Sequence, residues 1–475
     1  MRRMRAFLAL AVIAALAVAL PVQAGNSFAT STTTAGGYHT WDSDLINVED
    51  VTQTGDGVYV AVLDTGLVPN WSDYFPRARV ATSLGTGFDQ SVNFKAKNSD
   101  PCGVAIEVGA LRQTTYIGST GSSHGTHVAS TIIGYSYRSN TDAAQGFPLP
   151  AIQVRGIAPD VTIIPVKVLT DYQVPSLPKC TDPDVETGHV VFGTDGMVAA
   201  GINYVTHLKE TVLASNPVVI NMSLGGSALT TAEEDAIDDA IAAGVVIVAA
   251  AGNEGADGMS FPGAYAPVIS AGAAGWTGEW LDDGASGNPP SNGFRYRMWW
   301  LQNVMGNGAG VSGSIEPPLF ADSGDTADPT VAGDVYVTDF SSRELTGQDL
   351  DVVAPGSWVR GPFAGDPGYN HLPWWSRGIA DLLSRNSGNF FYVGGTSMAT
   401  PHVASLAALM LETNPELTAG LVESIMESTA LSLPAGTRSV WDPFATPRAF
   451  YPITWGGDAS GSGLIQVDDA IAAVP

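Results

Sequence analysis

The chain has 475 residues, with 47 acidic against 21 basic side chains and a formal net charge of −26. This length allows a large buried core, and so acidic a composition argues against nucleic acid as a partner, because phosphate binding requires clustered Lys and Arg. We interpret the excess of acidic residues as a means of staying soluble or of tolerating salt.

The first 24 residues have the pattern of an export signal. Basic residues near the start precede an apolar run over 6–20, and Val22-Gln23-Ala24 provides a small-residue cleavage site. The run is slightly short for a membrane span and no second long apolar stretch follows it, so a retained N-terminal anchor is the alternative that we disfavour. The sequence therefore predicts a secreted, extracellular protein with a signal peptide over 1–24 and no stable membrane insertion.

Short apolar runs without polar alternation recur along the chain, and they are typical of strands buried on both faces of a parallel sheet. They lie at 58–63, 161–168, 217–222 and 244–250. Helical patterns follow between them over 194–208 and 231–243, the second of which begins in a sequence that resembles a capping box. This alternation predicts an α/β fold, a three-layer sandwich with a mainly parallel central sheet.

Three segments interrupt the alternation. Residues 83–120 and 137–156 lack a regular period, and we expect them to be rich in loops. Residues 276–333 are richer still in Gly, Pro, Asp, Asn and Trp, and a structureless loop of that length is unusual inside a compact domain. We therefore predict a loop-rich or β-containing inserted subdomain over 276–333.

The chain has 2 cysteines, Cys102 and Cys180, and both lie in segments rich in Pro, Asp and Thr. In an exported protein they could form one disulfide across a long loop. Two free thiols are the alternative, which the spacing does not exclude. Neither cysteine belongs to a zinc-binding pattern, so we expect no metal–thiolate site.

Ser397 lies where a glycine-rich turn enters an apolar helical pattern. Pro401 is compatible with a first helical turn, because the N–H that it lacks would have no partner there. Free backbone N–H groups and the helix dipole favour negative charge at such a position. Ser397 is therefore a candidate nucleophile if a base lies nearby, and an ordinary N-cap serine is the alternative.

Two other polar residues lie where catalytic partners are expected, because sites in α/β proteins gather at the carboxyl edge of the sheet. Asp64 follows the first apolar run, where it can orient an imidazole or simply close the strand as an Asx turn. His124 opens another apolar helix and can act as general base and acid. His127 competes for that role, but we interpret it as a core histidine, and no glutamate accompanies the pair as in a metallopeptidase motif.

Asn253 follows the run at 244–250, directly after Ala251 and Gly252. Its side-chain amide can donate to an oxyanion, an interaction worth roughly 3–4 kcal/mol. A turn asparagine is the alternative. Each of these residues is ambiguous when it is considered alone, so their order and their flanking residues decide the interpretation.

The flanking residues form motifs along most of the chain. They are Val62-Leu63-Asp64-Thr65-Gly66, His124-Gly125-Thr126-His127-Val128-Ala129, Asn221-Met222-Ser223-Leu224-Gly225-Gly226, Ala251-Gly252-Asn253, Val352-Val353-Ala354-Pro355-Gly356, Gly395-Thr396-Ser397-Met398-Ala399-Thr400-Pro401-His402-Val403-Ala404 and Gly463-Leu464-Ile465. Together they strongly resemble the subtilisin-like serine peptidases, or subtilases, in which the catalytic residues follow the chain order Asp, His, Ser. The resemblance implies a subtilisin-like peptidase domain over 46–475, interrupted by the insertion and preceded by an N-terminal arm over 25–45.

The resemblance also implies a role for each matched residue. Ser397 would be the nucleophile, His124 the general base and acid, and Asp64 the residue that orients His124. Asn253 would form the oxyanion hole with the Ser397 backbone N–H. Ser223-Leu224-Gly225 resembles the edge strand that pairs with a substrate backbone. The pocket for the residue before the scissile bond would be lined by Gly225, Gly226, Ala251 and Gly252.

The activity implied is that of a secreted endopeptidase of broad specificity, acting on polypeptides through an acyl-enzyme and preferring large apolar residues before the scissile bond. No cofactor is expected for the chemistry. Asp73 resembles a calcium ligand of the family, but the loop around 135–155 departs from the family pattern, so a structural calcium ion stays open without assigned ligands and we assign no metal site. The short stretch between the predicted cleavage site and Asp64 predicts no long inhibitory propeptide, and the sequence leaves the oligomeric state unknown.

Two other functions are compatible with part of this pattern. A catalytically silent binding or scaffold protein can share the fold, but a decayed enzyme usually lacks at least one catalytic residue, and every position is filled here. An acyl hydrolase or transferase that acts on non-peptide substrates can use the same triad. The edge-strand motif at 223–225 favours extended peptides over such substrates.

Overall fold

A computed structural model describes residues 39–97, 100–119, 123–137, 152–178, 180, 188–281, 296–297, 330–363, 379–380, 390–442 and 449–475. The predicted signal peptide over 1–24 and most of the predicted arm and insertion lie outside these residues. Within the described ranges, no helix combines the length and the apolar character that crossing a membrane requires.

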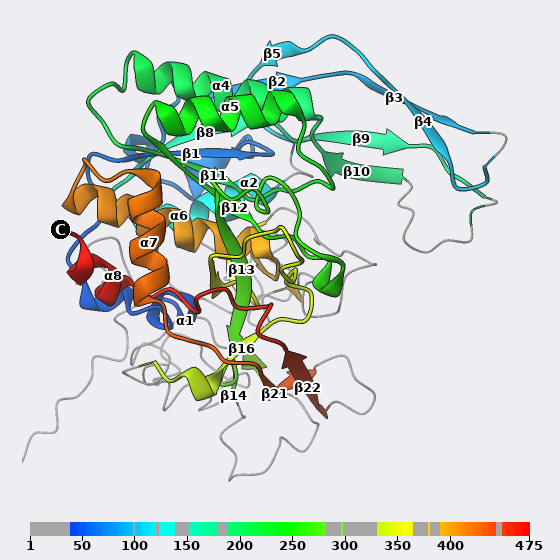
Figure 1. Ribbon diagram of the computed structural model, residues 1–475. Helices are drawn as coiled ribbons and strands as arrows, with labels where there is room; N and C mark the ends of the chain where they lie inside the picture. Colours follow the sequence, from blue (N-terminus) through cyan, green and yellow to red (C-terminus); the bar gives the residue numbers. More distant parts are fainter. Residues whose placement is uncertain are drawn as a thin grey trace, which may run out of the picture.

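A mainly parallel sheet lies at the centre of the molecule (Figure 1). Its strands follow the order β16-β13-β12-β11-β1-β8-β2-β5, and β17 pairs with β13. Their bounds are β1 (Tyr59–Asp64), β2 (Thr86–Asp89), β5 (Arg112–Thr114), β8 (Thr162–Lys167), β11 (Val218–Met222), β12 (Val245–Ala250), β13 (Ile269–Trp276), β16 (Val335–Val337) and β17 (Val352–Pro355). The four apolar runs of the sequence form β1, β8, β11 and β12, and nearly all their residues are buried.

Helices cover both faces of this sheet, which confirms the predicted α/β sandwich (Figure 1). The helices are α1 (Trp41–Asp44), α2 (His124–Ile133), α4 (Asp195–Glu210), α5 (Thr231–Ala242), α6 (Thr396–Thr413), α7 (Ala419–Thr429) and α8 (Val467–Ala473). One hydrophobic core joins α4 and α5 to the sheet, and a larger one joins α1, α2, α6, α7 and α8 to it. The predicted capping box starts α5, because Thr230 N–H donates to Glu233 Oε2 at 3.1 Å.

Residues 83–120, predicted to be rich in loops, also contain regular strands. This segment contains β2 and β5 together with a hairpin of β3 (Val92–Ala96) and β4 (Val104–Val108). A second hairpin is formed by β9 (Thr170–Val174) and β10 (Gly188–Phe192). The two hairpins touch, since the Phe94 ring lies 6.1 Å from the Tyr172 ring and 5.8 Å from the Phe192 ring, measured between centroids.

A disulfide joins the two hairpins. Cys102 lies in the turn between β3 and β4, and Cys180 follows β9, with the two Cα atoms 4.6 Å apart. The bond spans 78 residues of sequence and links two separate insertions between strands of the central sheet.

The remaining described strands belong to small sheets outside the central one. They are β6 (Gly134–Tyr137), β7 (Ile152–Arg155), β14 (Trp280–Leu281), β15 (Tyr296–Arg297), β18 (Val359–Pro362), β19 (Ile379–Ala380), β20 (Phe390–Val393), β21 (Gly436–Asp442) and β22 (Ala449–Trp455). Short 3-10 turns lie at Val48–Asp50, Trp71–Asp73, Arg77–Arg79, Gly255–Asp257 and Ala332–Asp334. The β14–β15 pair is the described part of the predicted insertion, and β6 and β7 are the described ends of the segment at 137–156.

Candidate active site

Three of the predicted site residues come from neighbouring strands. β1, β11 and β12 are parallel, so their carboxyl ends meet at one edge of the sheet. Asp64 ends β1, Ser223 follows β11 directly, and Asn253 lies just beyond β12. The helices α2 and α6 bring His124 and Ser397 to the same edge, each within its first turn.

Asp64 and His124 are in direct contact. Both carboxylate oxygens of the fully buried Asp64 lie 2.9 Å from His124 Nδ1, and Oδ1 also accepts the Thr65 N–H at 2.6 Å. A carboxylate only accepts hydrogen bonds, so Nδ1 carries the proton and Nε2 of the neutral ring keeps its lone pair. This arrangement leaves Nε2 as a base.

The contact depends on a close approach of α2 to the end of β1. Gly125 N–H donates to Thr65 Oγ1 at 2.9 Å. A Cβ at position 125 would lie 2.6 Å from Gly66 O and 3.0 Å from Asp64 Oδ1. Only glycine permits this approach without displacement of the helix, so Gly125 sets how near His124 comes to Asp64.

Electrostatics favour the protonated form of His124. Burial alone would lower the pKa of His124, but the negative charge of Asp64 and the hydrogen bond that His124 donates to it outweigh burial and raise the pKa above its ordinary value of 6.5. A raised pKa makes the neutral imidazole a stronger base. The first turn of α2 therefore presents a histidine suited to proton transfer.

His127 has the opposite character, as expected for a core histidine. It is fully buried, its ring lies 6.0 Å from that of Phe363, and backbone groups of Val359 and Phe391 lie near its ring nitrogens. Burial, together with the nearby charge of His124, lowers the pKa of His127 to about 3. His127 therefore stays neutral and lacks contact with Asp64 in the described part of the chain.

Ser397 and Ser223 hold each other by reciprocal hydrogen bonds. Ser397 Oγ donates to Ser223 O at 3.2 Å, and Ser223 Oγ donates to Ser397 O at 2.8 Å. Pro401 lies inside α6, beyond the first turn in which it was expected, and because it has no N–H the Ser397 carbonyl lacks the donor that a helix would normally supply four residues later. The Ser223 hydroxyl replaces that donor and ties the end of β11 to the start of α6.

Asn253 contacts the residue before Ser397. Its Oδ1 accepts the Thr396 backbone N–H at 2.9 Å and the Thr396 hydroxyl at 3.1 Å. A backbone N–H can only donate, so the carbonyl side of the amide must face Thr396, and Nδ2 points the other way. Among the described hydrogen bonds, none uses the Ser397 backbone N–H.

The glycines of the predicted pocket lie close to one serine. A Cβ at Gly225 would lie 2.6 Å from Ser260 Cβ, and one at Gly252 would lie 2.8 Å from Ser260 Oγ. Gly252 also has a φ of 108°, which favours glycine. Gly226 pairs with Phe261 through two backbone hydrogen bonds of 2.7 and 2.8 Å. The predicted pocket residues Gly225 and Gly252 therefore lie near each other, on either side of Ser260.

The remaining predicted pocket residue, Ala251, is buried, and its N–H donates to Ala271 O at 3.0 Å. Leu224, predicted as part of the edge strand, packs against the core beneath α4 and α5. Sequence analysis missed Glu254, although it directly follows Asn253. Glu254 Oε2 accepts from Ser260 Oγ at 3.1 Å and would lie 2.3 Å from a Cβ at Gly252, so its carboxylate lies directly beside Gly252.

The described residues assign no calcium ligands. Asp73 ends a 3-10 turn, where its Oδ2 accepts from Asn70 Nδ2 at 3.2 Å. Within the described ranges, no group of three or more His, Cys, Asp or Glu side chains is placed to hold a metal ion. Most of the loop expected near Asp73, residues 138–151, lies outside those ranges.

Residues 55–451 match the family model of the Subtilase family, peptidase S8. Subtilisin DY of Bacillus licheniformis is 29% identical over 317 residues, which cover 66% of this chain and 72% of that protein. Subtilisin E of Bacillus subtilis (strain 168) is 26% identical over 317 residues, covering 66% of this chain and 52% of that protein. The chain thus spans about half the length of several curated relatives that it matches.

A solved structure supports the fold. Fervidolysin of Fervidobacterium pennivorans, described as a keratinolytic enzyme related to subtilisin, superposes with a TM-score of 0.50 and 21% identity. The match covers 92% of this chain and 46% of fervidolysin. At this identity the likeness concerns the arrangement of strands and helices alone.

Proposed function

This chain belongs to the subtilase family, and we propose that it is a secreted serine endopeptidase that hydrolyses peptide bonds through an acyl-enzyme. The observation that carries the proposal is the contact of both Asp64 carboxylate oxygens with His124 Nδ1 at 2.9 Å. That contact fixes the tautomer that a general base requires. No step of the proposed chemistry needs a cofactor.

In the first proposed step, Ser397 attacks the substrate carbonyl. Rotation about its Cα–Cβ bond moves Oγ from Ser223 O, which it contacts at 3.2 Å, towards His124 Nε2. Nε2 takes the hydroxyl proton as Oγ bonds to the carbonyl carbon. The buried Asp64 charge then stabilises the imidazolium.

The developing oxyanion is proposed to bind between Asn253 Nδ2 and the Ser397 N–H. Two features support this site: the amide of Asn253 is oriented by Thr396, and the Ser397 N–H lies at the positive end of α6. His124 then gives its proton to the leaving amine, and a water molecule activated by the same imidazole releases the acyl group. Both halves of the reaction use the same side chains.

We propose that an extended polypeptide pairs with Ser223-Leu224-Gly225 and places one side chain in the pocket beside Gly252. The small residues Gly225, Gly226, Ala251 and Gly252 add no bulky side chain to this pocket. The Ser260 and Glu254 side chains lie beside Gly225 and Gly252, so a large apolar side chain of the substrate would pack against them. The Glu254 carboxylate at the border of the pocket makes a basic residue the main competitor. Such a pocket fits broad rather than narrow specificity.

The proposal is tested with a fluorophosphonate probe and with casein. The wild-type protein is expected to be labelled on Ser397 and to cleave casein, whereas Ser397→Ala should lose both properties. His124→Ala should also be inactive, while His127→Ala should act mainly on thermal stability. Labelling that persists in Ser397→Ala would refute the assignment of the nucleophile. Cleavage-site profiling on a peptide library then measures the preference before the scissile bond.

A further inference from the structure

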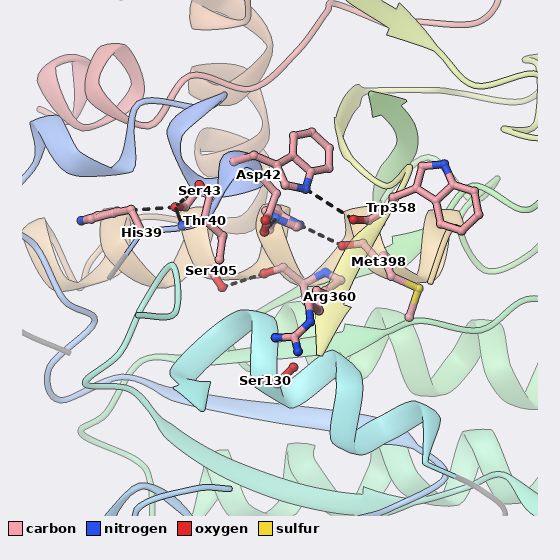
Figure 2. Close-up of polar contacts among 12 residues, drawn as sticks. His39, Thr40, Asp42, Ser43, Ser130, Trp358, Arg360, Met398 and Ser405 are labelled. Carbon is pink, nitrogen blue, oxygen red and sulfur yellow. Dashed lines mark hydrogen bonds and ion pairs between the residues drawn. The ribbon is translucent and has the colours of Figure 1, made fainter. Parts of the chain in front are cut away.

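The N-terminal segment at 39–45 packs beside the helix that carries Ser397 (Figure 2). Its short helix α1 begins after Thr40, whose N–H donates to Ser43 Oγ at 3.0 Å. Trp41 is buried in the larger core, and its Nε1–H donates to Trp358 O at 3.4 Å. These contacts hold the segment in place and present the side chain of Asp42 to α6.

Asp42 forms a buried hydrogen-bonded pair with His402 of α6. Asp42 Oδ2 lies 3.0 Å from His402 Nε2, and the two residues are 6% and 0% exposed. The contact joins residues separated by 360 positions in the chain. Removal of the Asp42 side chain would therefore leave the buried Nε2 of His402 without the partner described here.

His402 also forms a hydrogen bond with Met398, the residue that follows Ser397. Its Nδ1 lies 2.8 Å from Met398 O, and a carbonyl oxygen only accepts, so Nδ1 carries a proton. Nε2 faces a carboxylate, so a second proton lies on Nε2 or on Asp42. In both cases His402 is held at its two ends, by Asp42 on one side and by the Met398 carbonyl on the other.

The first turn of α6 has a particular need for such a support. Pro401 lacks an N–H, so the Ser397 carbonyl is held by the Ser223 hydroxyl rather than by a helical bond. Met398 N–H donates to Gly395 O at 3.0 Å, and Met398 O accepts from the His402 ring. The position of the turn that contains Ser397 therefore depends on side chains outside the regular helical ladder.

We propose that Asp42 is a positioning residue for the nucleophile, acting through His402 on the turn of α6 that carries Ser397. The N-terminal segment thereby completes the catalytic centre although it touches none of the proposed catalytic residues in the contacts described. The inference rests on the proposed function. It adds a requirement that the segment at 39–45 be docked before Ser397 reaches its working geometry.

The experiment compares Asp42→Ala with Asp42→Asn in the full chain. Alanine removes the hydrogen-bond partner of His402 Nε2, whereas asparagine keeps an amide at that place, which can accept or donate, and should restore most of the function. Displacements of about 1 Å near a nucleophile cost on the order of 100-fold in rate. We expect Asp42→Ala to lower kcat and the rate of fluorophosphonate labelling by roughly 10- to 100-fold, with KM changed less than about twofold.

Two matched controls separate positioning from loss of stability. Ser43→Ala removes a hydrogen bond inside α1, and Ile46→Val trims a buried side chain just after it, and no hydrogen bond from either side chain to His402 is found among the described residues. Both should lower Tm while leaving kcat near the wild-type value at a temperature where all variants are folded. Hydrogen exchange of the peptide 394–402 gives a readout independent of activity, and it should be about tenfold faster in Asp42→Ala alone if the turn loosens.

The outcomes distinguish the two proposals. Asp42→Ala with wild-type kcat, or exchange at 394–402 that matches the controls, would overturn the positioning role while the wild-type protein is still labelled on Ser397. If Ser43→Ala and Ile46→Val lost as much kcat as Asp42→Ala, loss of stability alone would explain the result, and the positioning role of Asp42 would be overturned as well. Absence of labelling in the wild-type protein would instead count against the proposed function, and the exchange measurement would still decide the positioning role.

Discussion

Replacement of Gly125 by alanine tests whether the approach of α2 to β1 sets the position of His124. The new Cβ would lie 2.6 Å from Gly66 O, whereas ordinary contacts begin at 3.4 Å, so the first turn of α2 must retreat by roughly 0.8 Å. Such a shift stretches the 2.9 Å contact between His124 Nδ1 and Asp64 beyond the usual hydrogen-bond range of about 2.7–3.2 Å. The base then loses both its orientation and part of its electrostatic support.

A misplacement of about 1 Å costs on the order of 100-fold in rate, so kcat/KM of Gly125→Ala should fall by roughly that factor. KM should change little, because the proposed pocket residues lie on other segments. The pKa of His124 should also fall, because the carboxylate that raises it is farther away. The acid limb of the pH profile of kcat/KM therefore moves to lower pH, which steady-state kinetics on a peptide anilide can measure.

Gly420→Ala is the matched control, because a Cβ at this helical position meets no atom within 4 Å and the residue lies on α7, away from the proposed site. It should keep the wild-type rate and pH profile. If Gly125→Ala also kept the wild-type kcat/KM, the close approach would not set the position of the base and the reasoning from Gly66 and Asp64 would be refuted. A drop in Tm without a change in the pH profile would show a packing effect alone.

Two further predictions follow from charged groups. Asp64→Asn should lower kcat/KM by about four orders of magnitude. Without the carboxylate, burial should bring the pKa of His124 below 6.5. An unchanged acid limb in the pH profile of the residual activity would contradict this expectation. Burial raises the pKa of Asp351 to about 7, although the hydrogen bonds that Ser270 donates to it act in the opposite direction. Protonated Asp351 therefore stabilises the folded state at low pH, and this contribution is lost as the pH rises towards 7. Asp351→Asn stays neutral and should lose less unfolding free energy between about pH 4 and 7 in urea titrations. Equal losses in both proteins would refute this.

The central sheet could be predicted from the sequence because its strands are buried on both faces. β11 and β12 consist entirely of buried residues, so each appears as one unbroken apolar run. The start of α5 could also be predicted from the sequence, since Thr230 and Glu233 form the hydrogen bonds of the capping box with each other and lie only three positions apart. The burial of each strand and the capping of this helix depend on residues close together in the sequence, so short sequence patterns were sufficient to predict them.

The two hairpins could not be predicted from the sequence, because their strands are partly or largely exposed and their stabilising contacts are distant in the chain. β3 and β4 are largely exposed, and Lys95 pairs with Glu107 across them in solvent, so their strands show no apolar run. They are held by contacts distant in sequence, including Phe94 on Tyr172 and the disulfide. The contact of Asp42 with His402 is likewise invisible in sequence, because nothing near either residue indicates the other.

The ambiguity of the site residues has a physical explanation, because the structural and the catalytic interpretations describe the same hydrogen bonds. Asn253 Oδ1 satisfies the Thr396 N–H, a donor that the start of α6 would otherwise leave without a partner, and this same bond turns Nδ2 towards the proposed oxyanion. Asn253→Asp separates the two roles, since a carboxylate still accepts from Thr396 and favours a helix N-terminus but offers no donor. We expect Asn253→Asp to keep the wild-type Tm and to lose at least about 100-fold in kcat, whereas Asn253→Leu should lose both. A large drop in Tm for Asn253→Asp would mean that the amide does more for the start of α6 than accept one hydrogen bond.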